Sequence, residues 1–209
     1  MAIKTSNCIE IEQKILILPT CSDSRIDNFA IDFIIQTLAL RSIAVLSSEH
    51  VQPLIQPPLF DSPRPVTTAM ELYSSPNSQI AAIQIRSTVK CKSVLARNLI
   101  EFAQANNVQE ILVVGACSGH LLSGEGLETT SRIRGINVEG LCQSLPAEIH
   151  CGGMTKYFVQ AGLRIVLAVS SGSIALLSEQ LAHAALTTAL SIPVKDMQVP
   201  QSVKQLITV

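Results

Sequence analysis

The sequence predicts an α/β domain in which helices cover both faces of a largely parallel sheet. Short, continuous apolar runs with the length of buried strands alternate with segments whose apolar residues recur at helical spacing. The chain has 209 residues, which fits one domain with a full hydrophobic core. We therefore expect residues 1–209 to form a single domain, with residues 191–209 as an irregular appendage to it.

A strand-helix-strand unit is expected near the start of the chain. Residues 15–18 read Ile-Leu-Ile-Leu, which predicts a short buried strand that ends at Pro19. Residues 26–40 predict a helix, and residues 43–46 a second buried strand. The helix positions that would face a sheet are all apolar: Ile26, Phe29, Ala30, Phe33, Ile34 and Leu38. Such a unit favours a parallel sheet.

The middle of the chain predicts a loop followed by further sheet elements. Five prolines between residues 51 and 66 exclude a helix or a central strand, so an extended surface loop is expected there. The elements expected next are strands at 69–73 and 80–86 around a Ser-Ser-Pro-Asn turn, a helix at 92–106 and a buried strand at 110–114. Arg97 and Glu101 form an i,i+4 pair on the polar face of that helix.

The last third predicts mainly helix. Residues 148–151 are expected to close a strand before a glycine pair. The elements expected after it are a helix from 154 to about 169, a break at 170–173, a long helix at 174–190, and a strand or short helix at 203–209.

The composition argues against several functional classes. Lys plus Arg is 15 and Asp plus Glu is 16, so no basic excess favours nucleic acid, and there is no Trp to stack bases on. Six cysteines form no C-x-x-C pair, which is typical of reduced thiols and not of a zinc site. We expect no metal and no cofactor.

Charged residues make up only 15% of the chain and apolar residues 47%. Either a partner covers part of the surface, or a large core is surrounded by a Ser- and Gln-rich surface; both interpretations stay open. No signal peptide is expected at the N-terminus, because Glu10 and Glu12 precede an apolar run that is too short. Arg164 and a Ser-Ser-Gly-Ser break interrupt the longest apolar stretch, so no membrane span is expected.

Two sequence patterns are candidate sites for chemistry. Cys117 and His120 follow a buried strand, where a thiol and an imidazole could act as nucleophile and base. We favour the interpretation that Cys117 is a buried thiol and His120 a surface residue, because no third residue orients the imidazole. Gly124-Glu125-Gly126 lacks the other residues of a phosphate loop and is interpreted as a flexible loop.

Gly152 and Gly153 precede a predicted helix. Their backbone N–H groups could bind an anion with help from Lys156, but we favour a structural turn that allows close packing.

Ile31 and Ile35 lie outside the sheet-facing stripe of the first helix. A helix that covers a sheet normally has one polar face, whereas this one is apolar nearly all round. Ile31 and Ile35 are therefore candidate contacts for a protein partner. The alternative is that another helix or the proline-rich loop covers them.

The order of these segments resembles the proteasome assembly chaperone 2 family. The segments that carry the resemblance are 15–19 with the helix at 28–38 and the run from Ile43 to Pro53, the strand 80–87 (Ile-Ala-Ala-Ile-Gln-Ile-Arg-Ser) with 110–114 and 118–120, and 152–156 (Gly-Gly-Met-Thr-Lys). Together they run through most of the chain.

The resemblance implies a three-layer αβα domain with a mixed, mostly parallel sheet, similar to nucleoside phosphorylases but without a working active site. It implies a heterodimer with proteasome assembly chaperone 1 that binds the α-subunit ring of the core proteasome and prevents off-pathway association, in the cytoplasm and the nucleus. Members of this pair can dock through a C-terminal hydrophobic–tyrosine–any-residue motif. This chain ends Ile207-Thr208-Val209, with Thr in place of the tyrosine.

Two other functions compete with this one. An enzyme of the phosphorylase or hydrolase type would use the crevice near Cys117 and His120, and would need convergent titratable groups in a pocket. A self-assembling homo-oligomer of the same fold is the third hypothesis.

Overall fold

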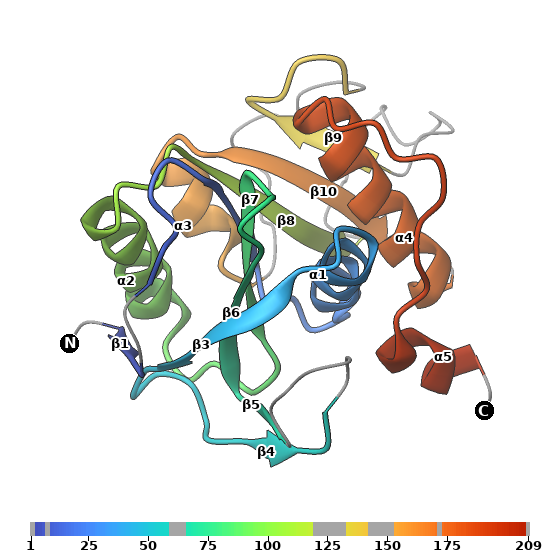
Figure 1. Cartoon of the computed structure of the whole chain (residues 1–209). Coiled ribbons are helices and arrows are strands. Elements are labelled where there is room, and N and C mark those ends of the chain that lie inside the picture. Colours follow the sequence, from blue (N-terminus) through green and yellow to red (C-terminus); the bar gives the residue numbers. More distant parts are fainter. Residues whose placement is uncertain are drawn as a thin grey trace.

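The computed structural model describes residues 3–6, 9–58, 66–118, 133–141, 153–170 and 173–207 (Figure 1). Its centre is one eight-stranded sheet. The strands are β1 (Lys4–Thr5), β2 (Ile15–Pro19), β3 (Arg41–Ser47), β6 (Met70–Ser74), β7 (Ile80–Ile85), β8 (Glu110–Ser118), β9 (Ile133–Ile136) and β10 (Arg164–Ser170). Across the sheet their order is β1-β3-β6-β7-β2-β8-β10-β9. A separate two-stranded ribbon pairs β4 (Ile55–Gln56) with β5 (Thr67–Thr68).

The middle of the sheet is parallel and its flanks are antiparallel. β2 pairs in parallel with β7 and with β8, and β8 pairs in parallel with β10. The other pairs, from β7 outward to β1 and between β10 and β9, are antiparallel. The sheet is therefore mixed, with β3, β7, β2, β8 and β10 running in one direction, as the sequence predicted.

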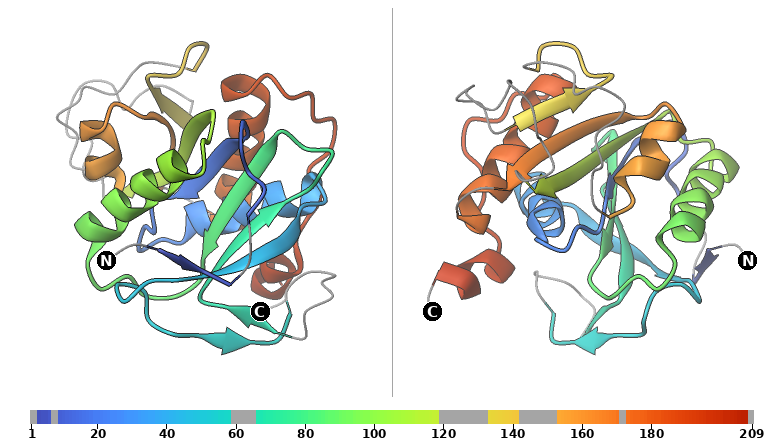
Figure 2. Two further views of the ribbon diagram at one scale, coloured as in Figure 1. Left: turned by 60° about the vertical axis from the view of Figure 1, so that its left-hand side comes forward. Right: turned by 180° about the vertical axis from the view of Figure 1, so that it is seen from behind.

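Helices cover both faces of this sheet (Figures 1 and 2). α1 (Ile26–Thr37), α4 (Ile174–Ala184) with its π-helical continuation η2 (Ala185–Ala189), and α5 (Gln201–Ile207) lie on one face; α2 (Lys92–Ala105) and α3 (Thr155–Gln160) lie on the other. The alternating side chains of β2 divide the core accordingly. Ile17 packs in the α1 and α4 layer, while Leu16 and Leu18 pack in the α2 and α3 layer. The three-layer α/β fold expected from the sequence is confirmed.

The first predicted strand-helix-strand unit forms, but its strands are not neighbours. β3 runs in the same direction as β2, and the β6–β7 hairpin lies between them. The turn sequence before residue 80 closes this hairpin, which pairs Ser74 with Ala81. The parallel neighbours of β2 instead come from later in the chain.

The predicted helix over residues 154–169 is wrong. α3 ends at Gln160, and residues 164–170 form β10, which lies between β8 and the edge strand β9. Gly162, whose φ is +71°, allows the turn between the two elements. Residues 165–169, Ile-Val-Leu-Ala-Val, are buried on both faces, so the run has no alternation by which its period could be recognised.

The C-terminal segment crosses back over the α1 layer. Residues 191–200 have no regular secondary structure, and the tail then ends in the short helix α5. A short helix was one of the two alternatives predicted for this segment. None of the helices in the described part of the chain is long and apolar enough to cross a membrane.

Candidate functional site

The loop after β2 lies at the carboxyl edge of the parallel strands, where open α/β sheets bind ligands. Asp27, in the first turn of α1, is fully buried there. Its carboxylate accepts hydrogen bonds from Thr20 Oγ1 at 2.8 Å, from Ser22 N at 3.0 Å and from Ser22 Oγ at 2.7 Å. Burial raises the pKa of Asp27, and the bonds from Ser22 and Thr20 oppose this. The Asp27 carboxylate therefore holds the β2–α1 loop in place through its hydrogen bonds with Thr20 and Ser22.

Gly153 packs against the same loop. Its φ is +67°, and a Cβ atom at this position would lie 2.4 Å from the carbonyl oxygen of Thr20. The next amide, that of Met154, donates to the same oxygen at 2.8 Å. Only glycine fits this turn, and it brings the start of α3 onto the β2–α1 loop. Gly152 lies outside the described residues, and Lys156 is exposed.

The cysteines near this edge differ in environment. Cys117 lies on β8 with an exposure of 2%, whereas His120 and Gly124-Glu125-Gly126 lie outside the described residues. Desolvation raises the pKa of the partly buried Cys21 well above its ordinary value, and the charge of Asp27 adds to this. A hydrogen bond with Ser93 lowers the pKa of Cys91. Within the described ranges, no cluster of three or more His, Cys, Asp or Glu side chains could hold a metal ion.

The predicted partner contacts of the first helix are not exposed in this chain. Ile31 is 0% exposed and Ile35 is 1% exposed, and both belong to the core cluster that includes residues of α4. α1 packs against the sheet and against α4 and α5, which lie on the same face of the sheet. A helix enclosed in this way is apolar all round without any partner. The exposure on which the interface hypothesis depended is therefore absent.

A buried polar cluster joins α5 to α1 and the sheet. The Asp32 carboxylate on α1 forms an ion pair with Arg86, with distances of 2.7 and 3.0 Å to the two terminal guanidinium nitrogens. It also accepts hydrogen bonds from Gln84 Nε2 and from Ser202 Oγ, each at 2.7 Å. Val203, the next residue of α5, is fully buried. The polar bond and the apolar contact together hold the C-terminal helix in place.

The cluster holds α5, the last helix of the described residues. α5 extends to Ile207, while Thr208 and Val209 lie outside the described residues. The predicted docking motif is therefore not placed by the structure.

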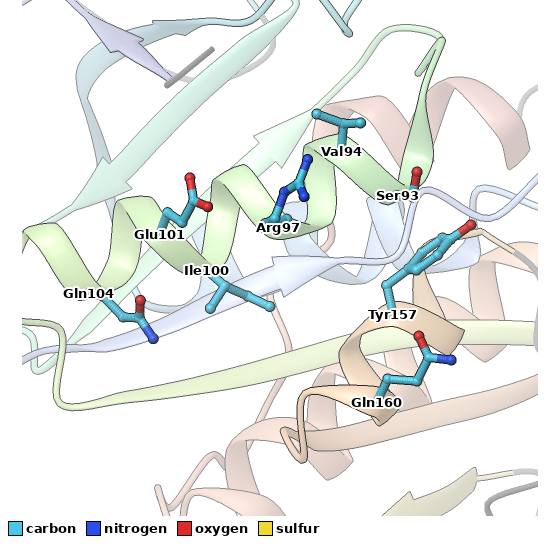
Figure 3. Close-up of a pocket in the computed structure, with 8 residues that line it drawn as sticks. All are labelled: Ser93, Val94, Arg97, Ile100, Glu101, Gln104, Tyr157 and Gln160. Carbon is cyan, nitrogen blue, oxygen red and sulfur yellow. The ribbon is translucent and has the colours of Figure 1, made fainter.

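A surface groove lies between α2 and α3 on the opposite face of the sheet (Figure 3). Its volume is about 500 Å³. The lining residues are Ser93, Val94, Arg97, Ile100, Glu101 and Gln104 from α2, with Tyr157 and Gln160 from α3. Val94, Ile100 and Tyr157 are half-buried, whereas Arg97, Glu101, Gln104 and Gln160 are exposed. The groove thus combines apolar and polar surface.

Sequence reasoning found only half of this groove. The polar face of α2 was predicted, with Arg97 and Glu101 as an ion pair, but the structure records no ion pair between them within 4.0 Å. In the sequence, Ser93, Arg97 and Glu101 are spaced four residues apart, which predicts that they lie on one face of α2. No sequence pattern of this kind predicts that α3 lies beside α2.

No protein-family model and no curated protein matches the sequence, but solved structures match the fold. A protein of unknown function from Thermoplasma acidophilum has a TM-score of 0.70 at 13% identity, over 94% of this chain and 84% of that one. PbaB of Pyrococcus furiosus, an archaeal proteasome activator, has a TM-score of 0.64 at 15% identity, over 99% of this chain and 94% of that one. PbaA of the same organism, an archaeal homologue of proteasome-assembly chaperone, has a TM-score of 0.64 at 17% identity, over 100% of this chain and 87% of that one.

At these identities the similarity establishes the fold of the chain. The structural neighbours include homologues of proteasome assembly chaperones, as the sequence resemblance predicted.

Proposed function

We propose that this chain is a chaperone for assembly of the core proteasome and that it acts by binding other proteins. The observation that carries this proposal is the fold. The chain matches PbaA and PbaB along almost its whole length, so the likeness is not confined to a common sheet motif. A fold shared by proteins with different activities does not assign a function by itself. The order of sequence segments, which points independently to the same family, supports the assignment.

The finer form of the proposal follows from that family resemblance. The chain pairs with a subunit like proteasome assembly chaperone 1, and the heterodimer binds the α-subunit ring and prevents off-pathway association. It works in the cytoplasm and the nucleus and uses no cofactor. Thr208 stands where the family motif has tyrosine, so docking in this proposal does not depend on Ile207-Thr208-Val209.

The competing enzymatic hypothesis depends on Cys117. Its side chain is 2% exposed, and a nucleophile must reach its substrate. This burial favours a structural thiol.

Affinity purification of the tagged chain from its native source, with identification of the co-purifying proteins, tests the proposal. We expect proteasome α subunits and a chaperone 1-like subunit, in amounts that Cys117→Ala leaves unchanged. Recovery of the chain without any proteasome subunit would contradict the proposed function. A hydrolytic or phosphorolytic turnover that Cys117→Ala abolishes would support the enzyme instead.

A further inference from the structure

The α2–α3 groove has an apolar floor. Ile100 and Tyr157 are half-buried side chains that also pack against the core of this layer, and Val94 is the third apolar residue of the lining. Figure 3 shows Tyr157 and Ile100 approaching the groove from different helices. The floor is therefore built on two elements that the core holds in place, and it does not depend on a loop.

Positive charge lies along one end of the groove. Arg97 is exposed and lines it, and no acidic group in the described part of the chain lies within ion-pair distance of its guanidinium. The Lys156 amine is 5.5 Å from the centre of the Tyr157 ring. Lys92, next to Ser93 of the groove, is 3.5 Å from an Asp23 carboxylate that is itself fully exposed. Arg97 is thus the cation that lines the groove, while Lys156 and Lys92 belong to positions next to lining residues.

Negative charge lies further along. Glu101 is one helical turn beyond Arg97 and lines the groove toward Gln104. Figure 3 shows the Arg97 and Glu101 side chains lying apart along α2. An occupant with one acidic group would meet attraction at the Arg97 end and repulsion at the Glu101 end, so it would bind in one direction.

We propose that this groove binds an extended segment of a partner protein that places a carboxylate beside an aliphatic side chain. The carboxylate pairs with Arg97, whose planar guanidinium can bind both of its oxygens. The aliphatic side chain covers Ile100 and Tyr157 and removes apolar surface from water. A volume of about 500 Å³ lies within the usual range for ligand pockets and accommodates a few residues. The choice of a protein as the ligand rests on the proposed function; the chemistry of the segment rests on the groove.

Titration of the full chain, labelled with nitrogen-15, tests the proposal by amide chemical shifts. The probes are two capped synthetic peptides, Gly-Asp-Leu-Asp-Ile-Gly and Gly-Lys-Leu-Lys-Ile-Gly, which share their aliphatic residues and carry opposite charges at the other two positions. We expect the aspartate peptide to shift the amides of Ser93, Arg97 and Tyr157 in a saturable manner. The lysine peptide should not do so. Arg97→Glu should weaken binding of the aspartate peptide by about tenfold or more.

Two variants serve as controls for the titration. Arg41→Glu makes the same charge change on β3, at an exposed position outside the groove, and should leave binding unchanged. Ile100→Ala keeps the charges and should weaken binding by a few-fold, because part of the apolar floor is lost. Equal binding of the two peptides, unchanged binding by Arg97→Glu, or no saturable shift would each overturn the proposal.

The peptide titration and the affinity purification together separate this inference from the proposed function. If the peptides fail to bind while the chain still co-purifies with proteasome subunits, only the groove assignment is wrong. If the aspartate peptide binds through Arg97 and no proteasome subunit co-purifies, the groove assignment stands and the proposed function fails.

Discussion

Asp32 is a buried carboxylate of α1 that binds side chains from the end of β7 and from α5. It is 1% exposed and accepts hydrogen bonds from Arg86, Gln84 and Ser202. Arg86 is in turn close to Tyr73, which donates to Glu71, and burial raises the pKa of Tyr73. Charge in such a site is tolerated only while every partner is present.

Asp32→Ala should therefore destabilise the fold strongly. It leaves the Arg86 guanidinium buried without its counter-charge, which costs about 3–5 kcal/mol of unfolding free energy. Urea unfolding followed by circular dichroism measures the loss. The double variant Asp32→Leu/Arg86→Met should lose less than the sum of the two single variants, because it removes both charges together. Additive losses would show that the two side chains are not coupled.

Ile35 shows where reasoning from residue pattern stops. Helical spacing correctly identified an apolar stripe with Ile31 and Ile35, but the pattern does not say what covers a stripe. In the structure α4, a neighbouring helix on the same face of the sheet, packs against it, which only the tertiary fold reveals. Ile31 is 0% exposed and Ile35 is 1% exposed, so both are core residues and not the partner contacts that we expected.

Ile35→Asp should thus unfold the domain, as should Phe33→Asp, since both side chains are 1% exposed. An unpaired carboxylate in the core costs about 4 kcal/mol or more. The matched control is Ile174→Asp, the same substitution at the first residue of α4, where the side chain is 40% exposed. It should change the unfolding free energy by about 0.5 kcal/mol or less. A folded Ile35→Asp variant in circular dichroism would contradict the core assignment.

Elements of the sheet could be predicted unevenly. β2, β7 and α2 were found close to their observed positions, because apolar runs of strand length and a clear polar helix face mark them. β10 was predicted as helix, because a strand buried on both faces has no period of two. What distinguishes it is its pairing with β8, a contact far away in the sequence.

α5 is an element whose stability depends on its docking. It has seven residues, and isolated helices of that length do not persist in water. The contacts that hold it include the Ser202–Asp32 hydrogen bond and the buried side chain of Val203. The preceding segment is attached to α1 through Gln198 N and Thr37 Oγ1 at 3.0 Å. The whole segment should be able to open without unfolding the sheet.

Ser202→Ala should loosen α5 selectively. Loss of a hydrogen bond to a charged acceptor costs about 1.5–3 kcal/mol, which corresponds to roughly tenfold or faster amide exchange in residues 201–207. Native-state hydrogen exchange measured by mass spectrometry gives the rates. Gln201→Ala, at an exposed neighbouring position, should leave them near the wild-type values. If α5 and the strands of the sheet exchanged faster by the same factor, α5 would open only with the whole domain.

At the scale of the molecule, the fold could be predicted better than the site. Alternating strands and helices predict three layers whatever the exact pairing, since each apolar face must be covered. The groove arises where α2 and α3 meet, and this meeting depends on Gly153, which brings the start of α3 onto the β2–α1 loop. The sequence predicted a structural turn at Gly152 and Gly153. It could not predict that this turn packs against Thr20 of the β2–α1 loop, because that contact is distant in sequence.

The proposed heterodimer should stabilise the folded chain. Only 15% of its residues are charged, and apolar side chains such as Ile55, at 75% exposure, and Leu176, at 48%, remain on the surface of the chain alone. A subunit that binds only the folded form stabilises it by mass action, by about 2.7 kcal/mol at a hundred times the dissociation constant.

For a domain of this size we expect the melting temperature to rise by about 5–10 °C when a chaperone 1-like subunit is added. Differential scanning fluorimetry of the chain, of the subunit and of their mixture measures this rise, with serum albumin as the control for crowding. Because Cys117 lies in the core and not at an exposed surface, a conservative Cys117→Ala change should lower the starting temperature while keeping the rise. A monodisperse monomer whose melting temperature does not respond to the subunit would contradict the heterodimer.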